Sequence, residues 1–136
     1  MKDHFSIADI DVTGYLGDGI YSEVYRGERD GNVYAIKLQK LDGETESAET
    51  DRQFMREAGT LARLDDPALP NVWEIGEHRG RKYLVMEFFD GESLETVLAA
   101  SSLEEPDVIA IAKSLASGLQ TLHEAGLVHR DLKPSN

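Results

Sequence analysis

The most specific stretch of this chain is its last one, His129-Arg130-Asp131-Leu132-Lys133-Pro134-Ser135-Asn136. It places a carboxylate, an ammonium group and a carboxamide within a few residues of one another. His129 and Asp131 could serve as metal ligands, but no second cluster of ligand residues accompanies them, which disfavours a metal centre built on this pair. The role of the stretch therefore depends on the sequence that precedes it.

The composition is typical of a globular protein with an acidic surface. Of the 136 residues, 40% are hydrophobic and 29% are charged, so disorder is not expected. The net charge of −12 argues against a nucleic-acid partner, because phosphate backbones require a surplus of Lys and Arg. The absence of Cys excludes disulfides and thiolate chemistry. We expect a cytoplasmic chain, because no stretch has membrane-spanning length and the N-terminus is charged where a signal peptide would be apolar.

The first half of the sequence predicts strands and the second half predicts helices. The predicted strands are 10–16, 22–29, 32–39, 72–77 and 82–88, and the predicted helices are 51–64, 93–100 and 107–125. The stretch 102–105 predicts a capping box for the long helix, and Gly126 predicts its left-handed end. The apolar face of that helix carries Val108, Ala112, Leu115, Leu119 and Leu122.

Two features of the predicted sheet suggest an anion site. Gly17-Asp18-Gly19 follows the first strand, and glycines let a backbone approach a phosphate closely and present its N–H groups, although a plain turn is an equal alternative. Strand alternation places Lys37 on an apolar face with Val33 and Ala35. An ammonium group there either binds a partner or extends along an edge strand to solvent.

Glu57 favours the first alternative for Lys37. The apolar stripe of the predicted helix consists of Phe54, Ala58, Leu61 and Leu64, and the carboxylate of Glu57 falls within it. Carboxylates are seldom buried without a partner, and a Lys on a neighbouring strand would be one. We therefore expect Lys37 and Glu57 to form an ion pair.

Together these stretches resemble the protein kinase family, and in particular its bacterial Hanks-type serine/threonine members. The last eight residues match the catalytic-loop pattern H-R-D-L-x-x-x-N. The stretch 16–24 resembles the glycine-rich loop G-x-G-x-x-G-x-V with Ser22 in place of the third glycine, and 34–37 resembles the strand motif V-A-I-K. The stretch 83–94 resembles the last strand and the hinge of the N-terminal kinase lobe.

The resemblance implies an α+β fold in two parts. Residues 1–89 would form an ATP-binding lobe with a five-stranded antiparallel sheet and a helix known as αC, and residues 90–136 would form the first helices of a truncated helical lobe. The implied activity is transfer of the γ-phosphate of ATP, with Mg²⁺, to a Ser or Thr hydroxyl of a protein substrate.

The resemblance also assigns roles to individual residues. Asp131 would orient the substrate hydroxyl, Lys133 would contact the γ-phosphate and Asn136 would bind Mg²⁺, while Lys37 paired with Glu57 would hold the α- and β-phosphates. The residues expected around the nucleotide are Leu16, Gly17, Asp18, Gly19, Ser22, Val24, Ala35, Lys37, Met86, Glu87 and Phe89.

The family's metal-binding Asp-Phe-Gly and activation segment do not follow Asn136. We therefore expect the chain to be the N-terminal piece of a longer kinase, inactive by itself and at best a weak binder of ATP, with apolar residues such as Ile109 exposed on its long helix. A short non-catalytic kinase-like module that binds nucleotide or protein is an alternative. A small-molecule phosphotransferase is another, and Arg130 and Lys133 count against it.

Overall fold

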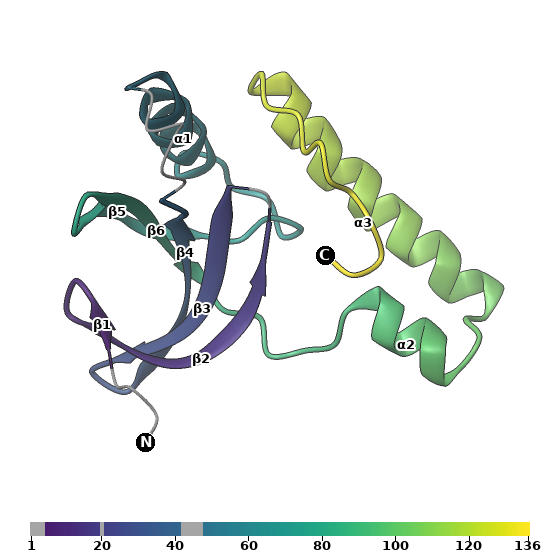
Figure 1. Ribbon diagram of the computed structural model, residues 1–136. Coiled ribbons are helices and arrows are strands. Elements are labelled where there is room, and N and C mark those ends of the chain that lie inside the picture. The colour runs from purple at the N-terminus through teal and green to yellow at the C-terminus, as the bar shows by residue number, and fades with distance from the viewer. Residues whose placement is uncertain (1–4, 20, 42–47) are drawn as a thin grey trace. The chain divides into compact units, whose positions relative to one another are not determined.

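The computed structural model describes residues 5–19, 21–41 and 48–136, which form an antiparallel sheet and three helices (Figure 1). The strands are β1 (Ser6–Ile7), β2 (Ile10–Asp18), β3 (Ser22–Arg29), β4 (Asn32–Gln39), β5 (Val72–His78) and β6 (Arg81–Glu87). The helices are α1 (Ala48–Leu61), α2 (Leu94–Ala100) and α3 (Glu105–Glu124). The predicted α+β class is confirmed, and every predicted strand and helix is present with its ends shifted by three residues or fewer.

The chain divides into two compact units. The sheet unit contains the residues up to Arg63 together with Pro70–Phe88, and so holds all six strands and α1. The helical unit contains Leu64–Leu69 and Phe89–Asn136, and so holds α2 and α3. The assignment of domains to 1–89 and 90–136 stays a prediction.

The six strands follow the order β1-β2-β3-β4-β6-β5, and all neighbours are antiparallel. The two-residue strand β1 was not predicted and extends the expected five-stranded sheet by one. The sequence Arg29-Asp30-Gly31-Asn32 is typical of a hairpin turn, and between β3 and β4 the chain turns at Asp30 and Gly31 with φ angles of 52° and 77°. Such positive φ angles match the twist of a two-residue hairpin.

The core of the sheet unit gathers on one face of the central strands. Its buried members are Ile7, Ile10, Ile36, Leu38, Tyr83 and Val85. Ile36 and Leu38 alternate with Lys37 along β4, so Lys37 lies on the opposite face, which it shares with the buried Ala35 as predicted. Gly27 on β3 permits this packing, because a Cβ there would lie 2.6 Å from Ile10 Cγ2 and 2.7 Å from Ile36 Cδ1.

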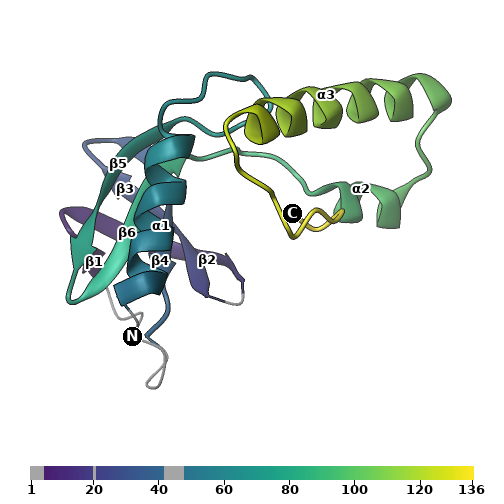
Figure 2. The ribbon, with the colours of Figure 1, turned by 90° about the horizontal axis from the view of Figure 1, so that it is seen from above.

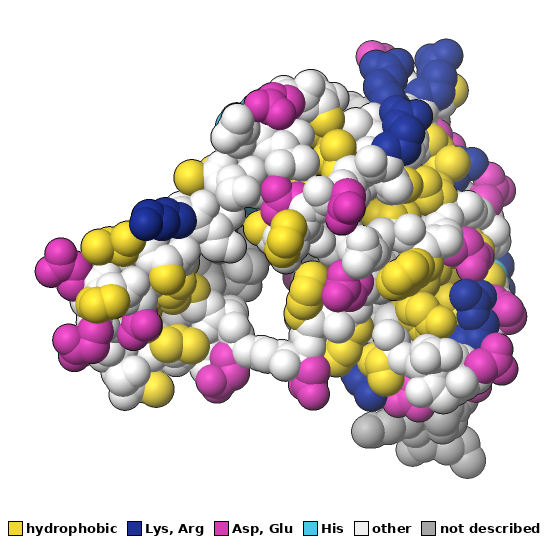
Figure 3. Space-filling model, turned by 180° about the vertical axis from the view of Figure 1, so that it is seen from behind, with side chains coloured by type: hydrophobic (Ala, Val, Ile, Leu, Met, Phe, Trp, Pro, Cys, Tyr) yellow, Lys and Arg dark blue, Asp and Glu magenta, His cyan; other side chains and the backbone are white. Residues whose placement is uncertain are grey.

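Helix α1 packs against β5 and β6 and buries Ala58 (Figure 2). Its first turn is joined to the sheet by a hydrogen bond from Gln39 Nε2 to Asp51 Oδ1 at 2.9 Å. Lys and Arg side chains gather over this helix, whose sequence includes Arg52 and Arg56, whereas Asp and Glu side chains are spread over the rest of the visible face (Figure 3). The acidic net charge is therefore not evenly distributed.

Local bonds at both ends fix the helices of the helical unit. The Ser93 side chain caps α2 by accepting a hydrogen bond from the N–H of Thr96 at 3.2 Å. The capping box predicted for α3 is wrong, because the N-cap is Glu104 and no side chain caps it. Pro106 fits this start because the first turn of a helix tolerates proline. The left-handed end at Gly126 is confirmed by its φ of 80°.

The segment Leu64–Leu69 is fastened to α3 through Asp66. Its carboxylate accepts hydrogen bonds from Thr121 Oγ1 at 2.7 Å and from the N–H of Ala68 at 2.8 Å. Gly118 lets the segment approach, because a Cβ there would lie 2.9 Å from the Ala68 Cβ. This contact holds the segment against the C-terminal half of α3.

The apolar face predicted for α3 is buried at one end and exposed at the other. Leu122 is buried, whereas Val108 and Leu115 are exposed. The predicted exposure of Ile109 is confirmed at 46%. Among the described residues, no helix is both long and apolar enough to cross a membrane. The cytoplasmic location stays a prediction.

Candidate active site

Strand register brings the predicted phosphate-contacting residues of the sheet unit into one row. Gly17 lies opposite Val24, Val24 lies opposite Lys37, and Lys37 lies opposite Leu84, across β2, β3, β4 and β6. Gly17 has a φ of 155°, and no atom lies within 4 Å of the position its Cβ would take. The backbone at Gly17 is therefore open on the side where a side chain would stand.

The turn between β2 and β3 is held by contacts that the sequence did not predict. Gly19 donates its N–H to the carbonyl of Ser22 at 2.8 Å, and the Ser22 side chain is buried. Lys40 Nζ donates to Asp18 Oδ2 at 2.7 Å and to the carbonyl oxygen of Gly19 at 2.8 Å. Hydrogen bonds from Lys40 and then from Tyr15 lower the pKa of the Asp18 carboxyl. The same carboxylate raises the pKa of Lys40.

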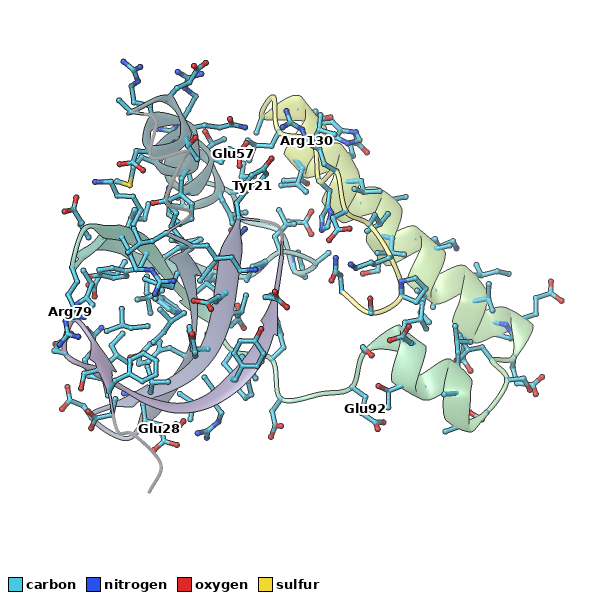
Figure 4. All side chains as sticks on the ribbon, viewed as in Figure 1. Tyr21, Glu28, Glu57, Arg79, Glu92 and Arg130 are labelled. Carbon is cyan, nitrogen blue, oxygen red and sulfur yellow. The ribbon has the colours of Figure 1, made fainter. Side chains whose placement is uncertain are left out.

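Lys37 and Glu57 are not joined in this structure. The Lys37 side chain is half-buried and has no hydrogen bond or ion pair among the described residues. Glu57 is exposed on α1, where its carboxylate accepts a hydrogen bond from Gln53 Nε2 at 3.1 Å (Figure 4). The expected burial of Glu57 is wrong, because α1 turns Ala58 towards the sheet in its place. Pairing of Glu57 with Lys37 stays a prediction for a nucleotide-bound state.

Of the residues expected around the nucleotide, Val24, Ala35 and Met86 lie in or beside the same row of the sheet unit. Ala35 is 6% exposed and lies opposite Met86 on β6. The N–H of Glu87 is donated to the carbonyl of Asn71 at 2.8 Å, so it is not free to bind a base. Phe89 is exposed and begins the helical unit, and Leu16 is also exposed. Ala35, Met86 and Val24 provide an apolar surface suited to a flat ring.

The last eight residues form a compact loop around Asp131. Asn136 Nδ2 donates to the Asp131 carbonyl oxygen at 2.6 Å and to Asp131 Oδ2 at 3.1 Å. Lys133 Nζ lies 3.4 Å from the same carboxylate oxygen. Hydrogen bonds from Asn136 and then from Lys133 lower the pKa of the Asp131 carboxyl. The carboxylate is therefore ionised at neutral pH.

The backbone of this loop is strained at Arg130. Its φ is 64°, a left-handed value that is uncommon for a residue with a side chain. Such a conformation costs about 1 kcal/mol and is concentrated at functional sites. Within the described residues no group of three or more His, Asp or Glu side chains gathers as a ready-made metal cage. A metal ion at this loop would therefore need ligands from outside the described residues as well.

Comparison with known proteins identifies the family. The protein kinase domain matches residues 10–136 of the chain. The chain belongs to the protein kinase family. The predicted resemblance to bacterial serine/threonine kinases is thereby confirmed, and it covers both units.

Similar kinases come from several bacteria. The serine/threonine-protein kinase pkn2 of Myxococcus xanthus is 38% identical over 123 residues, which are 89% of this chain and 15% of that protein. The probable serine/threonine-protein kinase PknB of Lactococcus lactis is 33% identical, over 89% of this chain and 20% of its own length. The crystal structure of the Mycobacterium tuberculosis PknI kinase domain matches all of this chain and 56% of its own, with a TM-score of 0.78 and 29% identity. The chain thus spans a small part of the curated kinases and about half of a solved kinase domain.

Proposed function

We propose that this chain supplies the ATP-binding and catalytic-loop residues of a serine/threonine protein kinase. The arrangement of Asn136 around Asp131 is the observation that carries the proposal. Because the Asn136 amide nitrogen donates to Asp131, its carbonyl oxygen points elsewhere and is left as an oxygen ligand of the kind that Mg²⁺ prefers. One loop then offers a carboxylate for the substrate hydroxyl and a ligand for the metal.

The protonation state of Asp131 suits the role of orienting a hydroxyl group. A carboxylate with a lowered pKa is a weak base, so it accepts a hydrogen bond from the Ser or Thr hydroxyl and aims its oxygen at phosphorus. Phosphoryl transfer depends on positioning and charge neutralisation more than on proton removal. Lys133, held 3.4 Å from Asp131, places a positive charge where the transferred phosphate would be attacked.

The residues of the sheet unit fit ATP. Lys37 is a half-buried ammonium group without a partner among the described residues, and an anion would neutralise it. Gly17 lies in the same row with open space at its Cβ position. When bound, ATP with Mg²⁺ supplies the phosphoryl group and neutralises its charge. Glu57 would join Lys37 only after α1 rotates, because it is exposed in this structure.

Activity of a longer protein that contains this chain tests the proposal. Lys37→Met and Asp131→Asn should each lower phosphorylation of a generic Ser/Thr protein substrate at least about 100-fold. Lys37→Met should also weaken ATP binding, whereas Asp131→Asn should not, because Asp131 faces the hydroxyl and not the nucleotide. The 136-residue chain, assayed alone, should show no transfer.

Lys82→Met is the matched control. Lys82 on β6 forms an ion pair with Glu77 on the neighbouring strand β5 and belongs to no proposed site. Its replacement should therefore leave activity unchanged. Full turnover by both Lys37→Met and Asp131→Asn would refute the kinase assignment. ATP binding without any transfer in the longer protein would favour the non-catalytic nucleotide-binding alternative.

A further inference from the structure

Lys40 lies just beyond the end of β4, yet its side chain reaches the turn between β2 and β3. Its ammonium group donates to Asp18 Oδ2 at 2.7 Å and to the carbonyl oxygen of Gly19 at 2.8 Å. Its backbone N–H donates to the carbonyl of Tyr21 at 2.9 Å. A single residue that follows β4 therefore contacts residues on both sides of the turn, Asp18 and Gly19 before it and Tyr21 after it.

The turn is also closed within itself. The N–H of Gly19 is donated to the carbonyl of Ser22 at 2.8 Å, and the Ser22 side chain is 7% exposed. Both polar groups of the Gly19 backbone are thus engaged, one by Ser22 and one by Lys40. A glycine whose two backbone groups are bonded has lost most of the freedom that a glycine otherwise has.

This arrangement differs from an ordinary surface ion pair. The charge pair of Lys40 with Asp18 is itself no more buried than the pair of Lys82 with Glu77, and water competes for the charges of both. Lys40 differs because it also bonds a backbone carbonyl. The carbonyl contact fixes the orientation of a peptide plane, which a charge pair between two flexible side chains does not do.

We propose that Lys40 is a positioning residue of the nucleotide site, which holds the glycine-containing turn in the conformation that covers the phosphates of a nucleoside triphosphate. The inference rests on the proposed function and adds to it a residue that contacts the turn and not the nucleotide. Holding the turn before binding removes part of the entropy loss that binding would otherwise carry. The effect is confined to ligands with phosphates, since a nucleoside alone does not extend beneath the turn.

The experiment compares ATP with adenosine by calorimetry on a longer protein that contains this chain. Lys40→Ala should weaken ATP binding about fivefold, equivalent to one charge-assisted hydrogen bond, and leave adenosine binding unchanged. Lys40→Arg keeps the donors and the charge and should stay within about twofold of the unmodified chain. Lys82→Ala, which removes an ion pair from the same sheet, should change neither affinity.

Amide hydrogen exchange provides a second measurement that does not depend on nucleotide. In Lys40→Ala the Gly19 amide should exchange about fivefold faster, while amides of the core strands keep their protection. Unchanged ATP affinity in Lys40→Ala, or an equal loss for ATP and adenosine, would overturn the inference. Failure of the unmodified longer protein to bind ATP at all would overturn the proposed function, and the exchange of Gly19 would then still decide whether Lys40 orders the turn.

Discussion

Replacement of Gly27 by Ala should destabilise the sheet unit severely. The new Cβ would lie 2.6 Å from Ile10 Cγ2 and 2.7 Å from Ile36 Cδ1, and 3.4 Å from the carbonyl oxygen of Asp11. Carbon atoms in contact normally stay at least about 3.5 Å apart. The two isoleucines therefore have to move by close to 1 Å, yet both are fully buried.

The size of the loss follows from that packing. Overfilling a well-packed core costs about 1–3 kcal/mol, and two clashes with fully buried side chains place this substitution near about 3 kcal/mol. For a domain that is stable by about 5–15 kcal/mol, this is a large fraction of the free energy of unfolding. The fold should persist in water, with a much lower midpoint of unfolding in urea.

Urea titration followed by tryptophan fluorescence measures the effect. Trp73 on β5 is the single tryptophan of the chain and lies in the sheet unit. Gly59→Ala is the matched control, because the same methyl group would meet no atom within 4 Å on α1. There it should raise the free energy of unfolding by about 0.5–1 kcal/mol, since Ala favours a helix more than Gly does. A Gly27→Ala protein as stable as the unmodified chain would refute the close packing of Gly27 against Ile10 and Ile36.

Two titrations test the electrostatics of the two units. The hydroxyl of Thr121, and then the N–H of Ala68, lower the pKa of Asp66 below its usual 3.8, so the stabilisation is present at neutral pH and is lost as the pH falls through the lowered pKa. In Asp66→Asn, the helix signal in circular dichroism should therefore depend less on pH in the acid range. An unchanged pH dependence would contradict the contact. Burial and then the hydrogen bond to Glu74 raise the pKa of Tyr83 to about 12, so its contribution is lost as the pH rises above about 10. Absorbance at 295 nm should show one tyrosine that titrates near pH 12, and this titration should be missing in Tyr83→Phe. An unchanged titration in Tyr83→Phe would contradict the raised pKa of Tyr83.

The sheet was predictable because its signals are local. Alternation along β4 separates Ile36 and Leu38 from Lys37, and glycine at Gly31 marks a turn with positive φ, so strand ends and faces could be assigned without tertiary information. Strand β1 gave too little signal, since two residues show no period. Its Ile7 is nevertheless fully buried, which only the folded chain reveals.

The rotation of α1 was not predictable in the same way. The helical period places Ala58 in the apolar stripe and Glu57 at its border, but it does not say how far the contact with the sheet extends to either side of Ala58. Packing against β5 and β6 selects Ala58 and leaves Glu57 exposed. Whether Glu57 pairs with Lys37 therefore depends on the orientation of α1 in a nucleotide complex.

The role of Lys40 could not be predicted because its contacts are distant in sequence. Asp18 lies 22 residues from Lys40, and no motif or period connects the two positions. Lys37 attracted attention because it interrupts an apolar face, whereas Lys40 follows the last strand residue and resembles an ordinary solvent-exposed lysine. Only the pairing of β3 with β4 brings its side chain to the turn.

The hydrogen bond between Asp66 and Thr121 can form only after both residues have been synthesised. The two residues are 55 positions apart, and Leu64–Leu69 leaves the ribosome before β5 and β6, whereas its partner helix α3 is made after both strands. The sheet can therefore close while this segment still lacks the helix that fastens it. Cleavage after Phe88 would leave the sheet unit with six residues whose contacts lie on the lost piece, so neither unit can be excised by a single cut.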